Sequence, residues 1–170
     1  IRPSGNPAIA AGLHELRGCT RILVLPLFPQ YSDATNGSVH AEAARVALSR
    51  RDAPALCLLP PFPDDAGYIQ ALAARVKETE HGRRIDHRFV SFHGIPKRYA
   101  DLGDPYPTHC RLTAEALART CGWKDDEWSL CFHEQQCCDY YCESSCCANI
   151  YTSSGNMFRV YFTSIANNIK

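Results

Sequence analysis

The sequence predicts an α/β fold of the parallel-sheet, Rossmann-like type, and two observations carry this prediction. Continuous apolar runs of strand length occur at 22–25 and 56–59, a largely apolar strand is expected at 88–92, and a further strand is expected at 128–132. Segments with helical periodicity separate these runs. Strands that alternate with helices form βαβ units, so we expect one parallel sheet with the carboxyl ends of its strands at one edge.

The expected helices carry start signals and apolar faces. Asn6, followed by proline, is a natural N-cap for the first helix. A second helix is expected at 38–50, and Asp64 or Asp65 caps a third one that carries an apolar stripe. A fourth helix, at 108–120, follows a turn rich in proline and aspartate, to which we assign no direct chemistry.

His93 stands out because it ends the apolar run 88–92 and is followed at once by Gly94. Ligands of open α/β sheets bind outside the carboxyl ends of the strands. An imidazole at that position can ligate a metal or accept a proton near neutral pH. The alternative at this point is a structural histidine bonded to a backbone carbonyl.

The length is that of one domain, and the composition gives no sign of a strongly charged surface that would bind a partner. The 170 residues have a formal net charge of zero, which gives no reason to expect a nucleic-acid partner. No apolar run reaches the roughly 18 residues of a spanning helix. The default expectation is a cytoplasmic protein, with organellar targeting left open because the sequence begins at Ile1 without methionine. Peripheral membrane association and oligomeric state are also left open.

The ten cysteines divide the chain into an α/β part, 1–132, and a Cys-rich tail, 133–170, of unknown structure. Four scattered cysteines in the first part are expected to be small buried hydrophobic residues. The others crowd together near the tail: Cys131, Cys137, Cys138, Cys142, Cys146 and Cys147. Their spacing lacks the paired C-x2-C pattern of zinc sites and the ferredoxin pattern, which disfavours metal binding by the tail.

Two segments resemble one family. The run SFHGIPKRYADLGDPYP at 91–107 resembles the signature segment of ferrochelatases, and LPLFPQYSDATNGS at 25–38 is also similar to that family. The resemblance covers residues 2–132 and does not extend into the tail. It implies an incomplete chelatase-like fold and insertion of ferrous iron into protoporphyrin IX in haem biosynthesis, with iron and porphyrin as substrates.

The resemblance also implies roles for single residues. His93 matches the family's invariant histidine, which takes protons or binds the incoming metal. Tyr31, Ser32 and Thr35 are expected beside the porphyrin or its propionates, together with Ser91 in the signature strand. The family's later glutamate has no counterpart here. For Thr35, capping of the following helix is an equally good interpretation.

Several expectations follow about cofactors and alternatives. Some ferrochelatases carry a 2Fe–2S cluster, but Asp33 stands near the place of one cysteine ligand, so we expect no cluster. The sequence departs from the family near Phe132, which suggests a frame change, aberrant splice or fusion and little activity in this chain. The alternatives are a chelatase that inserts cobalt or nickel into another tetrapyrrole, and a non-catalytic Cys-rich metal-binding protein.

Overall fold

The structure is a computed structural model, and it describes residues 8–133 and 157–162. Its strands confirm the parallel α/β class. The expectation of one continuous sheet is wrong, because the described strands form two separate parallel sheets.

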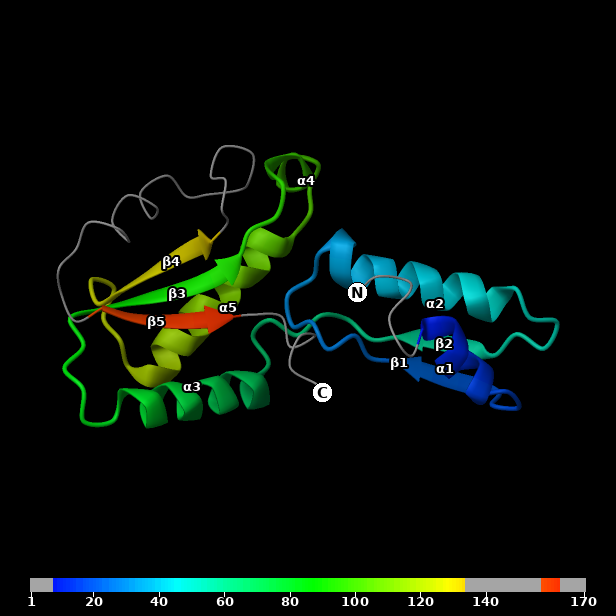
Figure 1. Cartoon of the computed structure of the whole chain (residues 1–170), viewed down its shortest axis with the longest axis horizontal. Helices are drawn as coiled ribbons and strands as arrows, with labels where there is room; N and C mark the ends of the chain where they lie inside the picture. Colours follow the sequence, from blue (N-terminus) through cyan, green and yellow to red (C-terminus); the bar gives the residue numbers. More distant parts are fainter. Residues whose placement is uncertain (1–7, 134–156, 163–170) are drawn as a thin grey trace.

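The first sheet has two strands and the second has three. Strand β1 (Arg21–Val24) pairs with β2 (Ala55–Leu58). In the second sheet, β3 (His87–His93) lies between β4 (Trp128–His133) and β5 (Met157–Phe162). Every neighbouring pair is parallel. Figure 1 shows the two sheets running towards each other, so that their carboxyl ends face the middle of the molecule.

The first sheet is covered by helices on one face. Helices α1 (Ile9–Glu15) and α2 (Ser38–Leu48) pack against it through a cluster that includes Ile22, which is 6% exposed. Side chains alternate along a strand, so Leu23 lies on the opposite face, where it is 63% exposed. Its register partner Cys57 is exposed as well. The described residues therefore leave this face of the sheet uncovered.

The second sheet has a denser core. Helix α5 (Tyr106–Cys121) packs on β3 and β4 through Val90 and Phe92, and helix α3 (Ala66–Glu80) packs on α5. Burying side chains of this size contributes about 1.5–3 kcal/mol each. The apolar run of β3 is thus explained by a central strand between two neighbours.

Several local predictions are decided by hydrogen bonds. Of the two aspartates proposed as caps of α3, it is Asp65 whose carboxylate accepts the backbone N–H of Tyr68, at 2.9 Å. The expected cap Asn6 lies outside the described residues. Helix α5 ends at Gly122, whose φ of 74° is the left-handed conformation that glycine adopts without strain.

Three elements were not predicted from the sequence. A π-helical segment η1 (Asp33–Gly37) precedes α2, and a short helix α4 (Lys97–Asp101) follows β3. Strand β5 belongs to the tail, whose structure the sequence left unknown, and it pairs with β3.

The burial of the cysteines differs in part from the expectation. Cys110 is fully buried in the core, as predicted, and burial raises the pKa of its thiol. Cys19 and Cys57 are exposed, so the expectation of burial is wrong for both. Cys57 is exposed because it lies on the uncovered face of the first sheet. The tail cysteines beyond Cys131 lie outside the described residues.

We predict that Leu23 contributes little to stability and much to self-association. Leu23→Thr should change the free energy of unfolding by less than about 0.5 kcal/mol, because the side chain is already in water. Ile22→Thr, the matched change on the covered face, should cost at least about 1.5–3 kcal/mol. Urea unfolding measures both values, and sedimentation velocity should show less association for Leu23→Thr. Equal destabilisation by the two variants would show that the face is covered.

Candidate functional site

His93 occupies the last position of β3 and is exposed there. It is in register with His133 of β4, so two neighbouring strands end side by side at this edge. Ser91, two residues earlier on the same strand face, is only 1% exposed. The structure thus places the imidazole of His93 at a surface and the hydroxyl of Ser91 inside the sheet. The substrate-binding role of Ser91 stays a prediction.

The segment that follows β1 is a loop held by buried polar side chains. Asn36 is completely buried, and its Nδ2 donates to the backbone oxygen of Phe28 at 3.1 Å. Gln30, also buried, donates through Nε2 to Oγ1 of Thr113 in α5 at 2.8 Å. Buried polar groups that are satisfied in this way stabilise one conformation of a loop.

Asp104 connects this loop to the segment that follows β3. Its Oδ2 accepts the hydroxyl hydrogen of Ser32 and the backbone N–H of Asp33, both at 2.9 Å. Its Oδ1 accepts the backbone N–H of Tyr106 at 3.0 Å. Bonds to a carboxylate are shorter and stronger than those between neutral groups. The two family-like segments are therefore joined directly.

His109 makes a second connection to the same loop. The backbone N–H of Tyr31 donates to its Nδ1 at 3.0 Å, so that nitrogen carries no proton. Burial lowers the pKa of His109, and the nearby carboxylates of Asp104 and Asp64 oppose this shift. The neutral imidazole is the form that the loop requires.

The side chain of Tyr31 folds back over the start of α2. A Cβ atom added at Gly37 would lie 2.6 Å from Oδ1 of Asp33 and 2.9 Å from the hydroxyl oxygen of Tyr31. Only glycine leaves room for both groups at this close approach. The absence of a side chain at Gly37 therefore positions the hydroxyl that the sequence assigned to the porphyrin.

The other predicted hydroxyls have backbone or side-chain partners within the loop. Oγ of Ser32 accepts the N–H of Ala34 and donates to Asp104. Oγ1 of Thr35 lies 3.3 Å from the carbonyl oxygen of Ser32 and 3.1 Å from Oδ1 of Asn36. These bonds satisfy groups within the loop, and no described side chain caps α2, so capping of that helix by Thr35 is wrong. A porphyrin contact for Ser32 and Thr35 stays a prediction.

Comparison with known proteins agrees with this arrangement. A sequence model of the family described as "Ferrochelatase" matches residues 3–137. The chain belongs to the ferrochelatase family.

Curated ferrochelatases from several bacteria match the same part of the chain. The protein from Nitrosococcus oceani is 42% identical over 77% of this chain and 36% of its own length. "Ferrochelatase 1" of Shewanella oneidensis is 44% identical over 77% of the chain and 40% of its length. The protein of Azoarcus sp. is 48% identical over 69% of the chain and 33% of its length. The chain thus spans well under half of the ferrochelatases that it matches.

Sequence reasoning missed the residues that hold the two family-like segments together. Asp104 was assigned only to a turn, and no role was given to His109, Gln30, Asn36 or Thr113. A signal was present for Gln30, because it is a polar residue next to a segment rich in leucine, phenylalanine and proline. Asn36 lies among other polar residues and carried no such signal. No signal in the sequence pairs Asp104 with a loop about seventy positions earlier.

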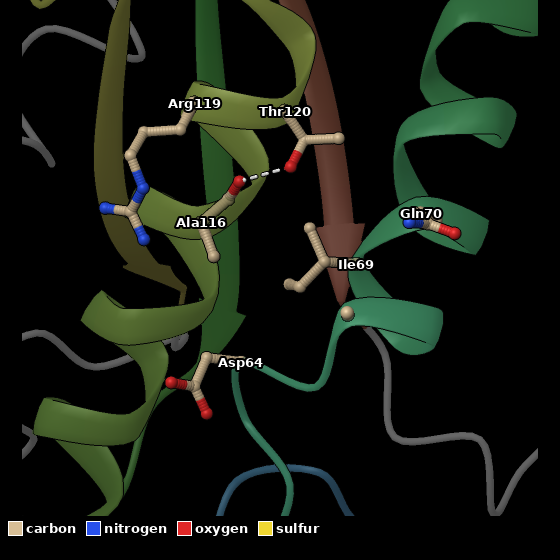
Figure 2. A pocket seen from close by; sticks show the side chains of 7 residues that line it. Asp64, Ile69, Gln70, Ala116, Arg119 and Thr120 are labelled. Carbon is tan, nitrogen blue, oxygen red and sulfur yellow. Dashed lines mark hydrogen bonds between the residues drawn. The ribbon is translucent and has the colours of Figure 1, made fainter.

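A groove of about 350 Å³ lies elsewhere, between α3 and α5. Figure 2 shows Ile69 and Ala116 in its wall, with Asp64 at one end and Arg119 and Thr120 at the other. The hydroxyl of Thr120 is bonded to the backbone oxygen of Ala116 at 2.8 Å. None of the residues expected in the ferrochelatase site lines this groove, and we assign it no part in the chemistry.

Within residues 8–133 and 157–162, no group of three or more histidines, cysteines and acidic residues could hold a metal ion. No helix in this part of the chain is both long and apolar enough to cross a membrane. The cysteines proposed for a cluster or zinc site fall largely outside these residues, so their metal binding stays untested.

We predict that Gly37→Ala stabilises the protein less than a glycine-to-alanine change elsewhere in a helix. The new Cβ must displace the exposed carboxylate of Asp33 and the hydroxyl of Tyr31, and this shift offsets part of the gain in helix propensity. Gly12→Ala in α1 is the control, because a Cβ there meets nothing within 4 Å. That change should stabilise by up to about 1 kcal/mol. Urea unfolding of both variants tests this, and an equal gain for the two would contradict it.

We predict an acid-sensitive stability that depends on His109. Because burial lowers its pKa in the folded state, the unfolded chain binds more protons just below the ordinary value of 6.5. This contribution is therefore complete above pH 6.5 and is lost as the pH falls through the lowered pKa. His109→Asn keeps an acceptor but does not titrate, so its unfolding free energy should fall less between about pH 7.5 and 5.5. Parallel pH profiles for both proteins would refute the assignment.

Proposed function

We propose that the chain provides part of a site for inserting ferrous iron into protoporphyrin IX, the lyase reaction of haem biosynthesis. Ferrous iron and the porphyrin are both substrates in this proposal. Its support is membership of the ferrochelatase family and the names of the relatives, each of which is called a ferrochelatase. Because the chain spans only part of their length, the complete activity is proposed rather than established for it.

The observation that carries the proposal is the meeting of two distant segments. The loop around Tyr31 and the segment that leaves β3 after His93 are bonded through Asp104 and His109. Both lie where the carboxyl ends of the parallel sheets face the middle of the molecule (Figure 1). Ligands of parallel α/β sheets bind at such ends.

Metal insertion needs a group that accepts protons and a ligand that takes the metal from water. Two pyrrole protons leave the macrocycle when the metal enters. A neutral imidazole can do both tasks near pH 7, because it is a moderate base and a good ligand for divalent iron and zinc. His93 is the proposed group, and its exposed place at the strand end supports access by both substrates.

The porphyrin itself needs apolar surface and partners for two carboxylates. Leu25 and Leu27 are about half exposed, at 49% and 53%, in the segment that leads to Tyr31. We propose that these side chains provide apolar contact and that the Tyr31 hydroxyl meets a propionate. The bonded loop then presents these groups in one arrangement before the porphyrin arrives, which reduces the entropy cost of binding.

We predict that metal insertion by this chain depends on His93. In an anaerobic assay with protoporphyrin IX and ferrous iron or zinc, His93→Ala should abolish whatever small rate the chain shows above the uncatalysed background, because a positioned proton acceptor is worth about 10²–10⁴-fold. Porphyrin affinity, followed by fluorescence, should be retained. His81→Ala is the control, because His81 is also exposed but lies at the end of α3. A full rate in the His93→Ala chain, or a parent chain that binds no porphyrin, would contradict the proposal.

A further inference from the structure

We propose that Asp104 is a positioning residue that holds the porphyrin-facing loop against the segment carrying His93. This inference rests on the proposed function and adds a residue to it. Asp104 is neither the proton acceptor nor a proposed ligand of the metal. It acts by setting the distance between the Tyr31 loop, which we assign to the porphyrin, and His93, which we assign to the metal.

The bonding of Asp104 exceeds what a turn requires. An aspartate that forms a turn before a helix needs to accept only one hydrogen bond. Its Oδ1 accepts that bond from the N–H two residues later, here that of Tyr106. Oδ2 is not needed for this turn. It accepts two further bonds, from Ser32 and from the N–H of Asp33, which are 72 and 71 positions away in the sequence. One of the two carboxylate oxygens, Oδ2, therefore connects segments that are distant in the sequence.

The connection is part of an ordered row. Going along the loop from Gln30 to Asp33, successive residues bond to Thr113, His109 and Asp104. Thr113 and His109 lie in α5, and Asp104 lies in the turn before the first residue of this helix. The loop therefore runs along the amino-terminal part of α5, and Asp104 holds its far end next to η1.

This row matters because the described strands of the two sheets are not paired with each other. No ladder of strand hydrogen bonds sets the position of the Tyr31 loop relative to β3. Side-chain bonds to α5 and its preceding turn do so instead. Asp104 supplies the negatively charged member, whose bonds are each stronger than bonds between neutral groups.

The test uses Asp104→Asn, which keeps the shape and removes the charge. An amide has one acceptor oxygen and one donor nitrogen, so it cannot accept all three hydrogens. We expect backbone hydrogen exchange at Asp33 to accelerate by about 10-fold or more, as for loss of a bond to a charged group. The Kd for protoporphyrin should rise by a similar factor. Asp101→Asn is the matched control, because Asp101 is an exposed aspartate that pairs with Lys97 in α4.

A second variant guards against simple unfolding. Ser32→Ala removes one donor to the same oxygen, and exchange at Asp33 in the double variant with Asp104→Asn should be no faster than in Asp104→Asn alone. Exchange is the measurement here because Ser32 is itself a predicted porphyrin contact. All values are measured well below the melting temperature, and additive acceleration in the double variant would overturn the connection.

The outcomes separate this inference from the proposed function. Exchange is measured without porphyrin, so unchanged exchange at Asp33 in Asp104→Asn overturns the connection itself. Faster exchange with an unchanged porphyrin Kd overturns its role in positioning. A parent chain that binds no porphyrin overturns the proposed function and, with it, the positioning role, while the exchange result still reports on the connection.

Discussion

The arrangement of this protein depends on a row of hydrogen bonds between one loop and one helix. The loop leaves the first sheet, and helix α5 covers the second (Figure 1). Their contact includes polar bonds from Gln30 and Tyr31 to the helix, and from Ser32 and Asp33 to Asp104 in the turn before it. Such bonds are directional, so they specify a spacing that apolar packing alone would leave less well defined.

The same bonds explain why the loop contains so many buried polar groups. Each costs free energy to remove from water and recovers it only when its partner is in place. Asn36 is satisfied within the loop, whereas Gln30 is satisfied by Thr113 of α5 and Tyr68 of α3. The polar groups of the loop are therefore satisfied only when it lies against these helices. A site built in this way is held in position before a ligand binds, which the proposed insertion of iron into a porphyrin would require.

Much of the local structure could be predicted from the sequence. The strand at 88–92 was found because its side chains are buried on both faces, which produces a largely apolar run. The N-cap of α3 could be narrowed to two aspartates because helix capping depends only on residues next to the start of the helix. His93 could be placed at the end of a strand because a glycine follows it. The prediction of a single sheet failed because an apolar run does not name the strand with which it pairs.

The sequence by itself determined the main strands and helices, the parallel α/β class and the resemblance that points to His93, because each depends on neighbouring residues or on a recognisable local run. Tertiary structure alone decided that the strands divide between two sheets. It also decided that Cys57 is exposed and that Asp104 and His109 bond a loop more than seventy residues away. The physical reason is that a carboxylate or an imidazole can accept a hydrogen from any donor that the fold brings to it, and nothing in the adjacent residues specifies which one.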